Sequence, residues 1–411
     1  MVFKGSNVVK KFKLSEITLN ITDGEHGTVQ DDKNGKYYLL SCKNVKNGNI
    51  NITQSDRIIS KESFDKIQKR IKLEKNDILI TTVGTIGEMA IIKTDEINYC
   101  FQRSVGIIKP NPKIVNPYFM YYALKKEMRQ IGTFVKGAVQ KCLFINDMKL
   151  IEIEIPDIIN QEKIVKILNN IDKKIELNNQ ISDNLLEMSQ LIFSNYINEN
   201  KSINYCKIKD LNPKLETGKR PNGGVGNILN GIPSIGAESI KKVGYFDYSK
   251  TKYVTEEYFE KMKKGIVKGY EILIYKDGGK PGYFMPNFSM FGEGFPYERC
   301  AVNEHVFLLD FNSIRFNIFY YYYFNSEEIR HKLHVLGSKS AAIPGINQQD
   351  ILNLEIPCVK EKDAYELFDI LEFNTKMIIK NSKQNHKLCQ LRDTLLPKLM
   401  NGEIDLDKIE I

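Results

Sequence analysis

Long uninterrupted runs of apolar residues are missing from this sequence of 411 residues. No window approaches the roughly 18 apolar residues that a membrane-spanning helix needs. The opening residues, MVFKGSNVVKKFKLSEI, also carry no apolar run of signal-peptide length. We therefore expect a cytoplasmic protein with no membrane partner. The apolar share of 42% and the charged share of 27% are ordinary for a globular chain of this length.

Closely spaced cysteine pairs of the CxxC kind are absent as well. The seven cysteines are scattered and odd in number, so we expect reduced, mostly buried thiols. His331 and His334 are three residues apart but have no evident third ligand, which favours a solvated helix end over a metal site. The net charge of +8 permits a polyanionic partner such as nucleic acid without requiring one.

Catalytic motifs are also missing, since the sequence has no GxSxG and no Walker A loop. The tetrapeptide NPYF at 116–119 resembles the catalytic motif of adenine methyltransferases, but it lacks the second proline and is typical of a helix cap. FGEG at 291–294 resembles a turn that binds S-adenosylmethionine, but Phe-Pro follows it instead of a helix. A loose nuclease motif, PD at 156–157 with EK at 162–163, is too tightly spaced to hold a metal. We expect a non-catalytic protein.

Residues 161–197 contain no proline and no glycine, and their apolar residues recur every three or four positions. This pattern predicts a helix of roughly 55 Å, too long for one small domain, so it should pack on another rod. Residues 366–400 repeat the pattern about 203 positions later. The predicted seam comprises Ile164, Leu168, Ile171, Ile175, Asn178, Ile181, Leu185, Met188 and Ile192 of the first stretch, and Leu367, Leu371, Ile378, Asn381, Leu388, Leu391 and Leu395 of the second.

An asparagine interrupts the apolar stripe at an equivalent position in each stretch, Asn178 and Asn381. A buried polar residue can fix the register of two helices at a cost in stability. A solvated asparagine at the edge of the stripe would give the same pattern, and the sequence favours neither reading.

The segments before the two predicted helices are built on one plan. Short runs with period-two apolar residues, bounded by Asn, Gly and Asp, predict mainly β domains. The run NDILIT at 76–81 matches YEILIY at 270–275, for example. We expect an α+β fold with a pseudo-twofold internal repeat: β-rich domains at 1–156 and 201–357, alternating with long helical regions at 157–200 and 358–411.

Basic and amide side chains placed in predicted turns are the positive signal for nucleic acid. Arginine and lysine can neutralise phosphates or bind guanine, and glutamine can bind adenine. The candidate DNA-binding residues are Lys43, Lys46, Gln102, Arg103, Lys136, Gln140 and Lys141 in the first copy, and Lys219, Arg220, Lys276, Lys280, Arg299 and Lys339 in the second.

The whole chain resembles the specificity subunits of type I restriction-modification systems. The resemblance rests on the two-copy layout, on INDMKLIEIEIP at 145–156 and INQQDILNLEIP at 346–357, on QEKIVKILNNIDKKIE at 161–176 and on LRDTLLPKLMNGEI at 391–404. It implies two target recognition domains, each reading one half of a bipartite, asymmetric sequence in double-stranded DNA. The long helices would form an antiparallel coiled coil that sets the gap between the halves.

The resemblance also implies partners and the place of the chemistry. The helix pair would dock two modification subunits, which methylate adenine N6 with S-adenosylmethionine, and through them restriction subunits that use ATP and Mg²⁺. This chain itself would hold no cofactor and no metal. Two alternatives remain open: a fused or solitary adenine-N6 DNA methyltransferase, which needs a Rossmann-like sheet with an intact cofactor loop, and a coiled-coil adaptor with no role on DNA.

Overall fold

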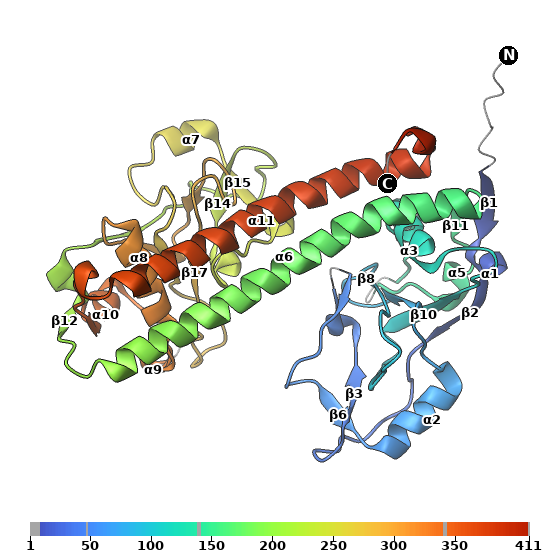
Figure 1. The fold of residues 1–411 in the computed structure, drawn as a ribbon, viewed down its shortest axis with the longest axis horizontal. Coiled ribbons are helices and arrows are strands. Elements are labelled where there is room, and N and C mark those ends of the chain that lie inside the picture. The colour runs from blue at the N-terminus through green and yellow to red at the C-terminus, as the bar shows by residue number, and fades with distance from the viewer. Residues whose placement is uncertain (1–8, 47, 138–140, 340–342, 410–411) are drawn as a thin grey trace. The chain divides into compact units, whose positions relative to one another are not determined.

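The computed structural model describes residues 9–46, 48–137, 141–339 and 343–409. They form two compact units: unit 1 is 1–172 with 390–411, and unit 2 is 173–389. The two long helices therefore form no unit of their own, because each is divided between units 1 and 2. Each unit is mainly one β-rich domain packed on helix, as Figure 1 shows.

Unit 1 begins with the first β-rich domain. Its strands pair in the orders β2-β10-β7-β8, β6-β3-β9, β1-β11 and β4-β5. The elements are β1 (Lys10–Lys13), α1 (Leu14–Ile17), β2 (Thr18–Asp23), β3 (Tyr37–Leu40), β4 (Val45–Lys46), β5 (Asn49–Ile50), β6 (Arg57–Ile59), α2 (Lys61–Ile71), β7 (Ile78–Thr81), β8 (Met89–Ile91), β9 (Tyr99–Phe101), β10 (Val105–Pro110), α3 (Pro117–Lys126), α4 (Met128–Thr133), α5 (Ile145–Met148) and β11 (Glu152–Ile155).

Unit 2 contains the second domain, whose strands pair in the matching orders β13-β19-β16-β17, β15-β14-β18 and β12-β20. The elements are β12 (Tyr205–Lys207), β13 (Lys214–Thr217), β14 (Ile232–Ile235), β15 (Lys252–Val254), α7 (Glu256–Glu260), β16 (Ile272–Tyr275), β17 (Phe288–Met290), β18 (Ala301–Val302), β19 (Val306–Asp310), α8 (Ile314–Phe324), α9 (Glu327–Gly337), α10 (Gln348–Leu352) and β20 (Glu355–Pro357).

The strand registers of the two domains also agree. Leu39 pairs with both Arg57 and Cys100 in the first domain. Ser234 pairs with both Lys252 and Ala301 in the second. The predicted duplication and the α+β class are therefore confirmed at the level of strand order and register, which apolar spacing alone could not define.

A helix covers the sheet of each domain because nearly all of its side chains are apolar or aromatic. In α3 the run from Phe119 to Leu124 is buried, and in α8 the run from Asn317 to Phe324 is buried. The Asn116 side chain accepts hydrogen bonds from the backbone amides of Tyr118 and Phe119, with Pro117 in the first turn. This confirms that NPYF is a helix cap. The helical segment that follows this cap is divided between α3 and α4.

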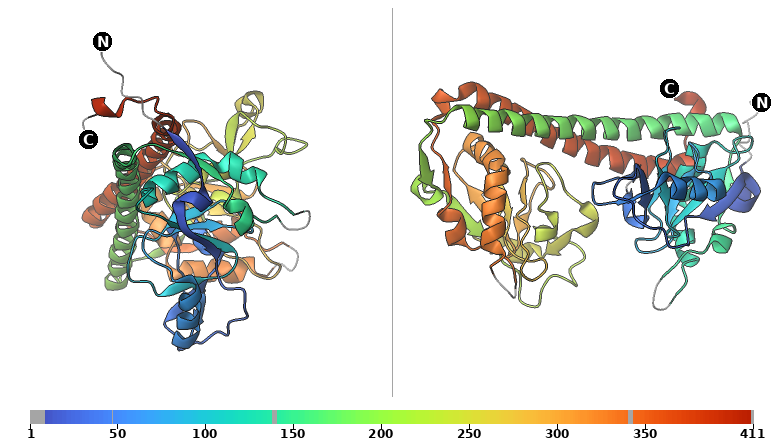
Figure 2. Two further views of the ribbon diagram at one scale, coloured as in Figure 1. Left: turned by 90° about the vertical axis from the view of Figure 1, so that its right-hand side faces the viewer. Right: turned by 90° about the horizontal axis from the view of Figure 1, so that it is seen from below.

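The two long helices are α6 (Ile158–Glu199) and α11 (Tyr365–Met400), slightly longer than the predicted stretches. They run antiparallel, since residue numbers fall along α11 as they rise along α6. In unit 1, Asp172 contacts Arg392. In unit 2, Asn178 contacts Gln384 and Ser189 contacts Asn374. Figures 1 and 2 show the two helices side by side within unit 2. None of the helices in the described ranges is long and apolar enough to cross a membrane.

Two cysteines depart from the expectation of reduced thiols. Cys206 and Cys358 form a disulfide, with their Cα atoms 6.1 Å apart. The antiparallel pairing of β12 with β20 brings together the two ends of the second domain, 152 residues apart in sequence. Because this proximity comes from tertiary structure, the spacing of cysteines along the chain gives no sign of it.

Candidate nucleic-acid interface

The loop after β2 meets the turn between β9 and β10 at one corner of the first domain, which we call corner 1 (residues 24–27 with 102–103). The backbone amide of Glu25 donates to the Phe101 carbonyl at 2.7 Å, and the amide of Arg103 donates to the Glu25 carbonyl at 3.0 Å. A Cβ atom on Gly24 would lie only 2.2 Å from the carbonyl oxygen of Gln102, so this close approach requires glycine.

The side chains of corner 1 line a cavity of about 260 Å³, together with Leu39 and Arg57. Two of them are already engaged: His26 contacts Asp23 at 2.8 Å, and Glu25 contacts Arg70 at 3.5 Å. The backbone amide of Gly27, with help from Arg70, holds the pKa of Glu25 below its usual value. The Gln102 amide and the exposed Arg103 guanidinium have no side-chain partner in the part of the chain that the structure describes, so both are available to a ligand.

Unit 2 has an equivalent turn at the place that we call corner 2 (residues 218–220 with 303–305): the backbone amide of Asn303 donates to the Ile235 carbonyl at 2.9 Å, as the amide of Gln102 donates to the Leu40 carbonyl at 2.8 Å in corner 1. A Cβ atom on Gly218 would collide with the Val302 carbonyl. The Arg220 guanidinium forms an ion pair with Glu304 and lies 3.2 Å from His305 Nε2. Burial alone would raise the pKa of Glu304, but the hydrogen bond from Arg220, a backbone hydrogen bond and the positive charge of Arg220 together outweigh burial and leave that pKa lowered.

Several other candidate cations are held by acidic groups of their own domain. Lys43 binds Asp56 at 2.8 Å, and Lys136 binds Asp147 at 2.8 Å. Lys276 forms an ion pair with Asp277 at 3.3 Å and also donates to the Glu304 backbone carbonyl at 3.0 Å. Arg299 forms ion pairs with Glu256 and Glu260 of α7. The exposed candidates without an ion pair among the described residues are Lys46, Arg103, Lys141, Lys219, Lys280 and Lys339. Gln140 lies outside the described residues.

The fragments that resemble catalytic motifs have structural contacts instead. Asp157 accepts a hydrogen bond from the Asn160 backbone amide at 3.0 Å, next to the start of α6. No helix follows Gly294, because residues 295–300 are irregular. The ring of His334 contacts the Phe284 carbonyl.

The seam of the helix pair contains more polar residues than the sequence predicts. Ile164, Leu168, Leu367, Leu371 and Ile378 are buried as expected. Ile171, Ile175, Leu185, Ile192, Leu388 and Leu395 are half-buried. Asn178 and Asn381, exposed by 1% and 7%, are buried. Asn178 donates to Gln384 and Asn385, and Asn381 donates to Ser182, so they contact the opposite helix instead of solvent.

Three predicted seam residues instead lie outside the seam. Ile181, Met188 and Leu391 are 45%, 43% and 47% exposed. Ser182 and Ser189 on α6 and Arg392 on α11 contact the opposite helix one position later in each case. The spacing of apolar residues gives no sign of these polar side chains, and the prediction therefore placed their apolar neighbours in the seam.

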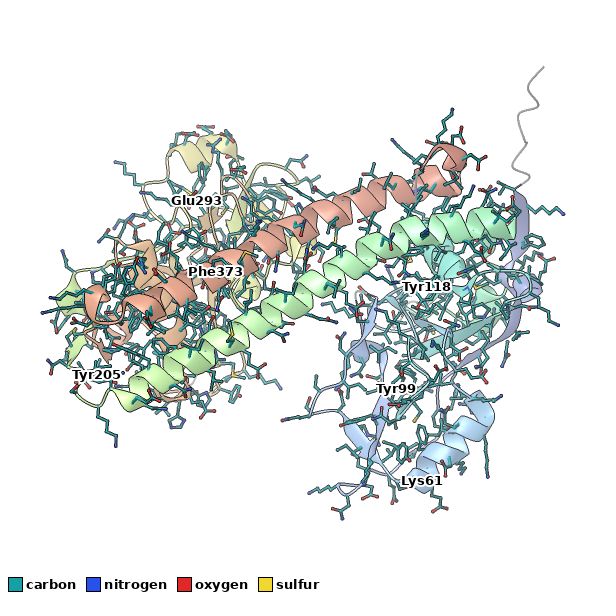
Figure 3. All side chains as sticks on the ribbon, in the orientation of Figure 1. Lys61, Tyr99, Tyr118, Tyr205, Glu293 and Phe373 are labelled. Carbon is teal, nitrogen blue, oxygen red and sulfur yellow. A yellow bond between two sulfur atoms is a disulfide. The ribbon has the colours of Figure 1, made fainter. Side chains whose placement is uncertain are left out.

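Exposed apolar residues form a stripe along the unit 2 part of α6, which we call the outer stripe: Leu177, Ile181, Met188 and Leu191. Their spacings of four, seven and three place them on one face of the helix. On α11, Ile370 and Phe373 are also exposed, by 39% and 63%. Figure 3 labels Phe373 on that helix. Apolar surface of this kind marks contact with another protein more often than scattered single residues do.

The sequence analysis named Gln102, Arg103 and Arg220 among the residues that lie at the corners, but it did not name the acidic and histidine residues there: Glu25, His26, Glu304 and His305. The loop of Glu25 and His26 differs between the two copies, which is the one sequence signal that pointed to them. Glu304 had no such signal, because its partner Arg220 is distant in sequence.

Several known proteins that are similar to this chain are specificity subunits of type I restriction enzymes. Residues 9–187 match the type I restriction modification DNA specificity domain. The type I restriction enzyme EcoBI specificity subunit of Escherichia coli is 34% identical over 145 residues, which are 34% of this chain and 30% of that protein. The MjaIX specificity subunit of Methanocaldococcus jannaschii is 24% identical over 381 residues, covering 88% of this chain and 84% of that protein.

The fold agrees with these sequence relatives. The crystal structure of a type I restriction-modification S subunit from M. genitalium matches with a TM-score of 0.53 at 17% identity, covering 97% of this chain and 98% of that one. The match spans both units and both long helices. The chain is therefore similar in sequence to the DNA specificity subunits of type I restriction-modification systems, most clearly over residues 9–187, and it shares the fold of one of them.

Proposed function

We propose that each β-rich domain reads one half of a bipartite, asymmetric sequence in double-stranded DNA. The observation that carries this proposal is the pair of corners, which lie at equivalent turns of the two domains and present different charged side chains. A shared scaffold with different loop side chains suits two readers of different sequences. The free guanidinium and amide of corner 1 are the groups that bind base edges in the major groove.

The long helices would set the gap between the two half-sites. The 42 residues of α6 form one unbroken helix, about 60 Å long at about 1.5 Å per residue. Hydrogen bonds to α11 occur in both units, at Asp172 in unit 1 and at Asn178 and Ser189 in unit 2. Specific polar contacts between helices favour one register over its alternatives, which is what a spacer of defined length needs.

The partners would be two modification subunits, and through them restriction subunits. Support comes from the outer stripe of α6 and from Ile370 and Phe373 on α11, which leave apolar surface exposed on the helix pair. S-adenosylmethionine, ATP and Mg²⁺ would bind to those subunits in the cytoplasm, and adenine would be methylated there. This chain would act as the non-catalytic reader.

Methylome sequencing of the source cell, with and without the gene for this chain, tests the proposal. We expect one bipartite methylated motif that disappears when the gene is deleted and returns when it is restored. Persistence of the motif after deletion would contradict it. Methyl transfer from S-adenosylmethionine by the purified chain alone would instead support the solitary methyltransferase, and an absence of salt-dependent duplex binding would support the adaptor.

A further inference from the structure

Corners 1 and 2 can be aligned residue by residue from the strand pairing. Cys100 pairs in parallel with Leu39, which also pairs with Arg57 of β6. Ala301 pairs in parallel with Ser234, which also pairs with Lys252 of β15, so Cys100 is equivalent to Ala301. Gln102 and Arg103 then correspond to Asn303 and Glu304. On the facing strand, Asp23 pairs with Gly106 and Thr217 pairs with Phe307. Glu25 and His26 therefore correspond to Lys219 and Arg220.

In this alignment, equivalent positions of the two corners carry charges of opposite sign. In corner 1 the β9–β10 turn carries the guanidinium of Arg103 and the facing loop carries the carboxylate of Glu25. In corner 2 the loop carries the cations Lys219 and Arg220, and the turn carries the carboxylate of Glu304. Each corner thus presents a guanidinium at its tip, but from opposite sides of the same backbone frame.

The contacts of each guanidinium differ. Arg103 is exposed and has no ion pair within the described ranges. Arg220 is held by Glu304, whose second carboxylate oxygen is buried and without a hydrogen-bond partner among the described residues. An arginine fork with one edge fixed by a carboxylate keeps its remaining N–H groups in a defined direction.

We propose that corners 1 and 2 are the base-reading elements of their domains, with Arg103 and Arg220 each binding one guanine and Glu304 positioning Arg220. Bidentate hydrogen bonds from a guanidinium to O6 and N7 are the commonest specific contact of arginine in the major groove. Arg103 lies on the turn of its corner and Arg220 lies on the facing loop, so the bound guanine would lie at a different place relative to each domain. Two copies of one fold would then read different half-sites. This inference rests on the proposed function and assigns its specificity to particular side chains.

The test uses the full chain assembled with its modification subunits and a duplex library randomised in both half-sites. The informative change is Arg103→Lys, which keeps the charge but removes the fork. We expect its preference for guanine to fall about 5- to 150-fold at one position of one half-site, with the other half unchanged. Arg129→Lys, an exposed arginine of unit 1 outside the corner, is the matched control and should select the wild-type sequence.

Corner 2 is tested in the same library. Arg220→Lys should weaken a guanine preference in the other half-site, and Glu304→Gln should weaken the preference at that same position with an unchanged melting temperature. A role for Glu304 in folding alone would lower the melting temperature and leave the selected base unchanged, which would contradict its positioning role.

The outcomes separate this inference from the proposed function. A bipartite sequence selected equally well by wild type, Arg103→Lys and Arg220→Lys would overturn the assignment of the corners and leave bipartite reading intact. A wild-type complex that enriches no bipartite sequence would overturn both.

Discussion

The side chain of Asn178 on α6 donates a hydrogen bond to the Gln384 side chain on α11 across 2.8 Å, and Asn178 is only 1% exposed. A second donor bond of the same length reaches Asn385. Further along unit 2, Asn381 contacts Ser182 and Asn374 contacts Ser189. These buried polar pairs decide between the two readings of the asparagines, because a solvated residue would need no partner on the opposite helix.

Replacing Asn178 should therefore destabilise unit 2. Asn178→Ala leaves the acceptors on Gln384 and Asn385 without this donor, and we expect the free energy of unfolding to fall by about 1–3 kcal/mol. Urea denaturation followed by circular dichroism measures it. Asn184→Ala, an exposed asparagine on the same helix, is the control and should change stability by less than about 0.5 kcal/mol. An equal decrease in the free energy of unfolding for both variants would mean that the Asn178 hydrogen bonds do not contribute to stability.

Asp56 should make the first domain sensitive to acid. Its buried carboxylate accepts hydrogen bonds from Asn44 and Thr53 and contacts Lys43. Burial opposes ionisation, but these partners outweigh it and hold the pKa below its usual value of 3.8. A pKa that is lower in the folded state gives stability that is present above the unfolded value and is lost as pH falls through the folded one.

Asp56→Asn should thus cost about 1–3 kcal/mol at pH 7, with the gap from wild type narrowing as pH falls below 4. Denaturant midpoints over pH 3–7 measure this difference. Asp65, whose side chain is 47% exposed and pairs with Lys61 on α2, supplies the control Asp65→Asn, for which we expect a small effect. A gap that stays constant with pH would show that the Asp56 charge is not what stabilises the site.

Charge reversal at Arg103 should weaken DNA binding most at low salt. Arg103→Glu removes one cation from the interface, so the slope of log affinity against log salt should fall by about one. In Arg220→Glu the new carboxylate would also lie next to Glu304, so the loss of DNA affinity in this variant should be accompanied by a loss of stability from repulsion between the two carboxylates. Titrations of labelled duplex at several salt concentrations give the slopes. Arg129→Glu makes the same change in net charge, and an equal effect for it would remove Arg103 from the interface.

Lengthening both long helices should lengthen the gap between half-sites. The insertion is seven residues in α6 between Asp172 and Asn178, and seven in α11 between Asn385 and Arg392, so that the contacts on either side are kept. Seven residues are two turns, which preserve the facing of the seam and add about 10 Å, equal to roughly three base pairs. The methylated motif of the variant should have a spacer longer by that amount. A spacer of unchanged length would rule out a ruler made of these helices.

The sequence predicts the repeated plan well because its signals are local. The absence of proline and glycine over 161–197 and the period of apolar residues indicate α6, and Asn116 with Pro117 indicates the start of α3. Tertiary pairing is where prediction from sequence ends. Arg392 replaces Leu391 in the seam because Asp172 lies opposite it, and Cys206 meets Cys358 because β12 pairs with β20.

The candidate interface shows the same division. Composition and turn signals point to Arg103 and Arg220, but they give equal weight to Arg299, which two glutamates of α7 already hold. Only the strand registers show that Arg103 and Glu304 occupy equivalent positions. Reversed charge at equivalent positions is thus a property of the fold, and no single stretch of sequence displays it.

Exchange of residues 1–156 for those of a relative with a different specificity tests the central claim most directly. Methylome sequencing of cells that carry the hybrid reads both half-sites at once. If each domain recognises its own half-site independently, one half of the motif should change while the other half and the spacer stay the same. A change in both halves would contradict the account.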